Sequence, residues 1–244
     1  MTHPKWLSRT DLLIGSVRLE KLRKAHVMVV GMGGVGSFAA EFLVRAGVGK
    51  LTLIDGDIVE ASNRNRQLPA LISTENQAKS EIMGKRFKDI NEEVKLKIIK
   101  EFINPEMVDH LFEEDRPDYI LDAIDTITPK ITFLKAAFDQ KIPIVSSMGA
   151  GGRLDPTKLS VVDISKTYNC PFAFQIRKRL RKVGIKKGIK AVFSSELVIE
   201  DSLMMTDGSS YKKSAYGTIS YLPATFGAVT ASVVVRDIIE LRQR

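Results

Sequence analysis

The chain has almost none of the side chains that build disulfide frameworks or metal centres. Cys170 is the only cysteine among 244 residues, which excludes an internal disulfide and a zinc site made of four thiolates from one chain. His3, His26 and His110 lie far apart, and none has the spacing of a metal-ligand pair. A lone cysteine with no histidine beside it is typical of packing rather than catalysis. It also suits a reducing compartment, so we expect a cytoplasmic protein.

Long hydrophobic runs are also scarce. The first 15 residues carry polar or charged side chains throughout and lack the apolar core of a signal peptide, so we do not expect secretion. Residues 217–235 contain no charged side chain and approach the length of a membrane span. Pro223 interrupts them, however, and Gly, Ser and Thr make them only mildly apolar. We therefore expect a strand over residues 218–222 and a buried helix from about Ala224, without stable membrane insertion.

The composition that remains is that of one basic globular domain. With 44% hydrophobic residues the chain can bury one large core, so we predict a single domain over residues 1–244. The net charge of +8 lies in residues 177–190, which hold eight basic side chains and no acidic one. Such a run indicates a polyanion partner such as nucleic acid, although a solvated basic helix has the same pattern and no aromatic residues are interleaved for base stacking. These side chains are Arg177, Lys178, Arg179, Arg181, Lys182, Lys186, Lys187 and Lys190.

Residues 26–57 have the pattern of a nucleotide-binding unit. A β-branched run at 27–30 predicts a buried strand, and an apolar helix is expected over 37–46. Between them stand four glycines, Gly31, Gly33, Gly34 and Gly36, which allow a tight turn and let phosphate approach backbone N–H groups at the positive end of the helix. Asp55 follows a second predicted strand at 51–54, where a carboxylate takes ribose hydroxyls in such folds. The motif alone leaves NAD, FAD and ATP open.

Strands and helices continue to alternate after this unit. We predict helices over 77–90, 105–113 and 129–140 and strands over 95–99, 119–123 and 142–146. This alternation predicts an α/β, doubly wound, Rossmann-like and mostly parallel sheet, with its ligand site at the carboxyl ends of the strands. Beyond the fifth strand the pattern weakens. We expect a strand over 159–163, a basic helix over 177–190, a short strand at 197–199 and a loop over 201–214 with a turn at Asp207-Gly208. Residues 165–215 are predicted to be an inserted, substrate-binding segment.

Polar residues near the predicted strand ends favour nucleotidyl transfer over redox chemistry. They are the segment NRNRQ at 63–67, Lys79 and the segment DAIDT at 122–126. An NAD-dependent oxidoreductase has no need of arginine and lysine around the phosphates. A nucleotidyl-transferring enzyme does need them, because negative charge builds on the α-phosphate and the departing pyrophosphate. Arg66 and Lys79 would stabilise that charge while an aspartate holds Mg²⁺.

The glycine motif, the D-x-D after the second strand, N-x-N-R-Q, the lysine and the DAxD pair together resemble the adenylation domain of ubiquitin-activating-enzyme-like proteins, the ThiF/MoeB/HesA superfamily. Within it, MGAGG-x-x-DPTK, DISKT, RKRLRK and VFSSE are most similar to the tRNA threonylcarbamoyladenosine dehydratases. The resemblance implies an AMP-forming enzyme that uses ATP and Mg²⁺ to cyclise threonylcarbamoyladenosine beside the anticodon of tRNA. K⁺ or Na⁺ is a further candidate cofactor, and a cysteine desulfurase with its sulfur acceptor is a further candidate partner.

The resemblance also implies a role for each matching residue. Arg66, Lys79 and Asp125 would act in catalysis, with Asp125 as the magnesium ligand, and Arg9 would reach the ATP site of the partner in a homodimer. Asp122 has a second interpretation, the satisfaction of backbone groups, which stays open. The implied nucleotide-binding residues are Gly31, Gly33, Gly34, Gly36, Asp55, Asp57, Asn63, Asn65, Gln67 and Asp122.

Two alternatives are retained. One is an activator of a ubiquitin-like sulfur-carrier protein, which would recognise a protein C-terminus instead of RNA. The absence of paired C-x-x-C zinc ligands and the presence of the basic run disfavour it. The other is an NAD-binding oxidoreductase or regulatory module, which the residues around the phosphates disfavour.

Overall fold

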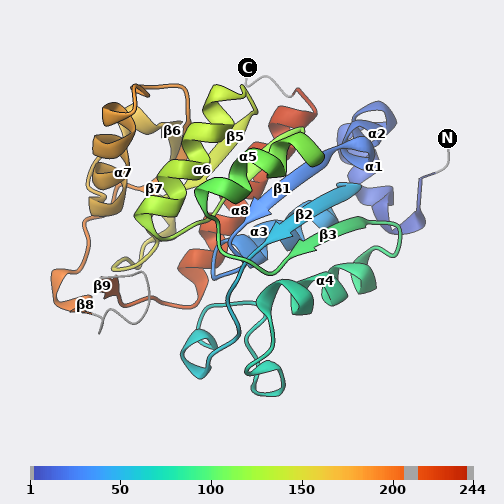
Figure 1. Cartoon of the computed structure of the whole chain (residues 1–244). Helices are drawn as coiled ribbons and strands as arrows, with labels where there is room; N and C mark the ends of the chain where they lie inside the picture. Colours follow the sequence, from blue (N-terminus) through green and yellow to red (C-terminus); the bar gives the residue numbers. More distant parts are fainter. Residues whose placement is uncertain (1–2, 206–213, 241–244) are drawn as a thin grey trace.

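In the computed structural model, which describes residues 3–205 and 214–240, a seven-stranded sheet lies between two layers of helices (Figure 1). The strand order is β3-β2-β1-β4-β5-β7-β6, and every neighbouring pair is parallel except β6 and β7. This is the doubly wound α/β fold that the alternation predicts. The strands are β1 (His26–Val30), β2 (Lys50–Ile54), β3 (Lys95–Ile99), β4 (Tyr119–Asp122), β5 (Ile144–Ser147), β6 (Leu159–Asp163) and β7 (Lys190–Ser194).

Each face of the sheet buries its own hydrophobic core. Successive strand residues point to opposite faces, so Val27 and Val29 of β1 join one core while Met28 and Val30 join the other. The first core is covered by α2 (Ser16–Lys24), α3 (Gly36–Arg45), α4 (Lys79–Ile90) and α8 (Tyr221–Ile238). The second is covered by α5 (Pro105–Glu114), α6 (Ile127–Asp139) and α7 (Pro171–Lys182). Burial on both faces explains why the central strands are continuous apolar runs.

Several elements after the fifth strand differ from the sequence-based expectation. The helix α7 ends at Lys182, because Gly184 adopts φ +87° and closes its last turn. The rest of the basic run is therefore a loop, and Lys190 begins β7. This strand lies within the segment 165–215, and it pairs with β5 and β6 in the main sheet.

The region around Pro223 was also predicted wrongly in part. The expected strand over 218–222 is absent, and α8 already begins at Tyr221. Pro223 lies in the first turn of that helix, where its missing N–H leaves no intrahelical bond unmade. Among the described residues, no helix is long and apolar enough to cross a bilayer.

Two short strands pair with each other before α8. Residues 197–199 form no strand, and the antiparallel pair is instead β8 (Leu203–Met205) with β9 (Ser214–Tyr216). The predicted Asp207-Gly208 turn lies outside the described residues.

Candidate active site

The glycine-rich turn joins β1 to α3 at the carboxyl end of the sheet. Gly31 has φ +91° and donates its N–H to Ile54 O at 2.8 Å, which ties the turn to β2. A Cβ on Gly36 would lie 1.7 Å from Gly31 O, so only glycine lets α3 start this close to the strand. The positive end of the α3 dipole therefore lies at the carboxyl end of β1. This is a phosphate-binding arrangement.

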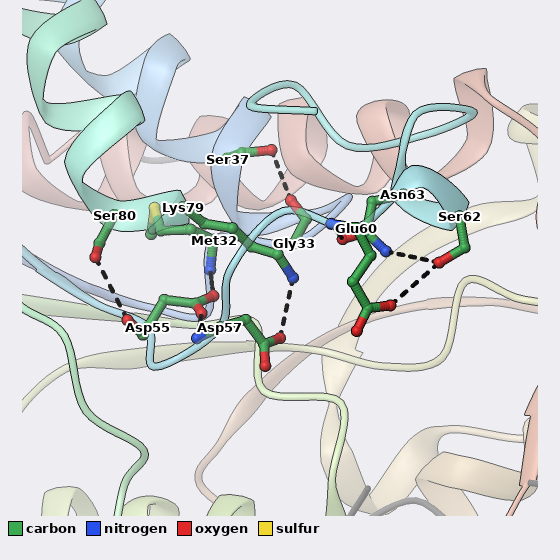
Figure 2. Close-up of polar contacts among 10 residues, drawn as sticks. All are labelled: Met32, Gly33, Ser37, Asp55, Asp57, Glu60, Ser62, Asn63, Lys79 and Ser80. Atoms are coloured by element: carbon green, nitrogen blue, oxygen red, sulfur yellow. Dashed lines mark hydrogen bonds and ion pairs between the residues drawn. The ribbon is translucent and has the colours of Figure 1, made fainter. Parts of the chain in front are cut away.

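Asp55 connects this turn to the loop after β2 (Figure 2). Its carboxylate accepts hydrogen bonds from the backbone N–H of Met32 and, at 2.7 Å, from that of Asp57. Burial raises the pKa of Asp55, whereas these two N–H groups and the charge of Lys79 oppose the shift. The carboxylate thus lies beside the glycine turn, where ribose hydroxyls are bound in dinucleotide folds.

Lys79 lies at the first position of α4, and its side chain is only 5% exposed. The Nζ atom is 3.0 Å from the carboxylate of Asp57, whose side chain is 53% exposed (Figure 2). The backbone N–H of Lys79 also donates to Asp57 O at 3.1 Å, which fixes the start of the helix. A buried cation is therefore held against an exposed carboxylate. An anionic ligand can therefore replace Asp57 as the partner of the Lys79 ammonium group.

The crossover loop between β2 and α4 brings a second cation to the site. Arg66 donates to Ser62 O at 3.0 Å and to the side chain of Asn65 at 2.9 Å. Burial lowers the pKa of Arg66, and the negative charges of Asp125 and Glu60 oppose that shift. Arg66 and Asp125 come from different loops and still interact electrostatically, so the fold brings together two residues that the sequence separates by a strand, two helices and another strand.

Of the neighbouring polar residues in that loop, two hold the loop in place and one has an unused hydrogen-bond acceptor. The Asn63 side chain accepts the Glu60 N–H at 3.2 Å, and Asn65 donates to Thr218 O at 2.9 Å, so both hold the loop in place. Gln67 lies next to Gly33, with its Nε2 atom 3.9 Å from where a glycine Cβ would be. Within the described structure the Gln67 Oε1 atom is buried without a hydrogen-bond partner, and it is therefore available to a ligand donor.

Asp122 supports the site from beneath, and the prediction that it contacts the nucleotide is revised. Its side chain is 0% exposed and pairs with the equally buried Lys130, with 2.7 Å between Nζ and Oδ2. The same carboxylate accepts Ser146 Oγ at 2.6 Å and the Ile124 N–H at 3.0 Å. The Nζ of Lys130 also donates to Ile124 O and Ser147 O, both at 2.9 Å. The second interpretation, a carboxylate that satisfies buried groups, therefore describes Asp122.

Sequence reasoning did not identify Lys130 at all. It occupies a helix in which a lysine is ordinarily solvated, and the only signal was the apolar residues three and four positions later on the same helix face, Phe133 and Leu134. Burial lowers the pKa of Lys130, and the charge of Asp122 opposes the shift. The pair holds the ends of β4 and β5 together and binds Ile124, the residue before Asp125.

Asp125 is the carboxylate expected to hold magnesium. Among the described residues, no three metal-ligating side chains gather in one place. Mg²⁺ keeps several waters and is commonly held by one or two carboxylates and by substrate phosphates. Asp125 is a carboxylate of the kind that Mg²⁺ takes, and its charge acts on Arg66.

Arg9 lies at the opposite end of the sheet from this site. It belongs to α1 (Ser8–Ile14), which follows directly after Leu7. A Cβ on Gly47 would be 3.2 Å from the Leu7 side chain, so this segment packs just before the start of β2. Asp55 follows the end of that strand, whose five residues span about 17 Å. Figure 1 shows α1 and α2 at the upper right, away from the crossover loop at the bottom. Arg9 therefore does not belong to the site of its own chain.

Three comparisons with known proteins find relatives of this chain. Residues 7–243 match the model of the ThiF family. The chain is 41% identical over 240 residues to the tRNA threonylcarbamoyladenosine dehydratase of Bacillus subtilis, with 96% of this chain and 94% of that protein covered. It also resembles the crystal structure of the E. coli tRNA N6-threonylcarbamoyladenosine dehydratase in complex with ATP, with a TM-score of 0.86, 35% identity and coverage of 97% and 94%. The AMP complex of the E. coli enzyme gives a TM-score of 0.87, 35% identity and coverage of 98% for both chains.

Proposed function

The chain belongs to the ThiF family, and from that premise we propose that it is an ATP-dependent tRNA threonylcarbamoyladenosine dehydratase. The observation that carries the proposal is the extent of the similarity to such dehydratases. It does not stop at the nucleotide-binding half, and it continues through the glycine cluster at 149–152 and the basic segment. The substrate is threonylcarbamoyladenosine in tRNA, and the products are its cyclic form, AMP and pyrophosphate. We place this activity in the cytoplasm.

The reaction requires that the threonyl carboxylate, a poor acyl donor, is activated by attachment of AMP. An oxygen of the threonyl carboxylate attacks the α-phosphorus of ATP, and the bond to pyrophosphate breaks. In the resulting mixed anhydride the neighbouring carbamoyl group attacks the acyl carbon and loses a proton, and AMP leaves with the former carboxylate oxygen. No covalent enzyme nucleophile is needed. The site must hold the two ends in contact and exclude water.

The residues of the crevice divide this work. The N–H groups at the start of α3 bind phosphate, and Asp55 accepts hydrogen bonds from the ribose hydroxyls. Lys79 exchanges its contact with Asp57 for a phosphate oxygen, and Arg66 stabilises the charge that develops during transfer. Asp125 would hold Mg²⁺, which when bound neutralises the triphosphate.

Arg9 adds a role for a second subunit. Because it lies at the far end of the sheet from its own site, a catalytic Arg9 must act in the site of a partner. We therefore include a homodimer in the proposal. The family resemblance also implies K⁺ or Na⁺ as a candidate cofactor and a cysteine desulfurase with its sulfur acceptor as a candidate partner.

Mass spectrometry of anticodon-loop nucleosides tests this function. After incubation of the protein with ATP and tRNA that carries threonylcarbamoyladenosine, we expect the modified nucleoside to lose one water and AMP to appear in equal amount. Lys79→Ala should reduce the rate by about 10²–10³-fold, the usual effect of losing one charge-stabilising donor. Lys85→Ala, an exposed lysine on the same helix, is the matched control and should leave the rate unchanged.

A different outcome would favour the first alternative. If tRNA is unchanged, and exchange of pyrophosphate into ATP is stimulated by a small protein that ends in Gly-Gly, the chain is an activator of a sulfur carrier. Mass loss from tRNA without ATP consumption would contradict adenylation itself.

A further inference from the structure

The basic side chains at 177–190 do not form one surface, because some of them contact other parts of the protein and the others are exposed. Arg177 donates to the Thr167 hydroxyl and lies 5.9 Å from the centre of the Phe174 ring. Lys190 belongs to β7 and pairs with Asp237. These two side chains stabilise the segment itself. The cations that remain lie on the exposed part of α7 and in the loop after it.

Three of the remaining cations line one groove between α6 and α7. The groove has a volume of about 400 Å³, and its lining includes Lys178, Arg179 and Lys182. With Gln175 they occupy positions i, i+3, i+4 and i+7, which is one face of a helix over two turns. Ile131 and Val183 complete the lining, so the described residues that form the groove contribute cations and an amide and no carboxylate. A groove of this kind is complementary to an extended anion.

The groove borders α6, the helix that follows the loop with Asp125. Arg179 donates to the Thr128 hydroxyl at 3.3 Å, and Thr128 is the second residue of α6. Asp125 lies three residues earlier and immediately precedes Thr126, the N-cap of the same helix. A chain of phosphates that leaves the site at Asp125 would therefore pass the positive end of α6 and enter the groove.

We propose that the groove between α6 and α7 binds the sugar-phosphate backbone of the tRNA next to the modified adenosine. The proposal rests on the dehydratase function for the identity of the RNA. The three lining cations are exposed and spread over two helical turns, which suits a succession of phosphodiesters better than a single free phosphate held in a closed pocket. Arg181, Lys186 and Lys187 are also exposed but do not line the groove. They contribute general attraction at most.

The salt dependence of tRNA binding separates these two sets of cations. Each phosphate contact contributes about 0.7–0.9 to the slope of log affinity against log salt. The groove variant Lys178→Gln/Arg179→Gln/Lys182→Gln should therefore lower the slope for unmodified tRNA by about 2–3. Between 50 and 200 mM KCl, the factor by which the wild type loses affinity should be about 20–40 times the factor for this variant. The control Arg181→Gln/Lys186→Gln/Lys187→Gln removes the same charge and should change the slope by less than about 1.

Equal slopes for the groove variant and the control, or a groove variant with the wild-type slope, would overturn the proposal. Thermal melting and ATP binding of both variants should match the wild type, and the single variant Lys182→Gln should show about a third of the triple effect if the triple variant folds poorly. The dehydratase function is judged separately, by the loss of water from modified tRNA with the wild-type protein. A protein that binds tRNA through the groove but cyclises nothing would preserve this inference and refute the function.

Discussion

Lys130→Met should strongly destabilise the protein. The ammonium group is fully buried, and its three N–H bonds go to Asp122 Oδ2, Ile124 O and Ser147 O at 2.7, 2.9 and 2.9 Å. Methionine has a similar shape, so the substitution removes the charge without opening a large cavity. It leaves the Asp122 carboxylate buried with two donors, Ser146 Oγ and the Ile124 N–H, and no cation.

Breaking a buried ion pair in this way costs about 3–5 kcal/mol. In a chain of this size each kcal/mol lowers the melting temperature by about 2–4 °C, so a fall of roughly 6–20 °C is expected. The double variant Asp122→Asn/Lys130→Met removes both charges, and it should recover most of that loss because no unpaired ion remains. Urea unfolding of the wild type, both single variants and the double variant completes the cycle.

Two results of this cycle would refute the reasoning. A loss below about 1 kcal/mol for Lys130→Met would mean that water reaches the pair and that the strand ends are not held by a buried charge. A double variant as unstable as the single one would assign the effect to the hydrogen bonds with the two carbonyl groups, and not to the unpaired carboxylate.

Three further results are expected. Gly36→Ala places a Cβ 1.7 Å from Gly31 O, so it should cost about 1–3 kcal/mol and abolish the stabilisation of melting by ATP; normal ATP binding would contradict the tight turn. Burial lowers the pKa of His26 below its ordinary 6.5, so the unfolded chain binds more protons and stability should fall as the pH drops below about 6.5. His26→Gln should flatten that dependence in pH-dependent urea titrations. Arg9→Ala and Arg66→Ala proteins, each inactive alone, should regain about a quarter of wild-type activity when mixed, because half of the dimers are mixed and each has one intact site. No recovery after subunit exchange would refute catalysis across the interface.

The sequence predicted the first half of the fold because local signals there agree with the tertiary structure. The strands at 27–30 and 95–99 are marked by β-branched and apolar residues, and the glycines between β1 and α3 have a direct steric reason. Later elements lacked such agreement. The strand β7 begins at Lys190, which in the sequence looks like the end of a basic helix. Pro223 indicated a break between two elements, but it lies in the first turn of α8.

The candidate site was predictable to the same extent. Asp55 and Lys79 occupy the positions that the motif predicts, at the end of β2 and the start of α4. The burial of Lys130 depends on Asp122 standing opposite it on a neighbouring strand, which is information that no single segment contains. The contacts of Arg177 and Lys190 likewise depend on partners outside the basic run, Thr167 and Asp237.

The packing of α8 against α3 implies that a newly synthesised chain binds a nucleotide only after α8 has been made. A Cβ on Gly227 would lie 2.6 Å from Val35 O and 3.0 Å from the N atom of Ala39, so α8 presses directly on the start of the phosphate-binding helix. Phe226 and Val234 of α8 complete the same core that supports β1. During synthesis, the glycine turn leaves the ribosome long before its covering helix does. Nascent chains that end before α8 should therefore be unable to retain ATP, and we expect binding only when α8 is in place.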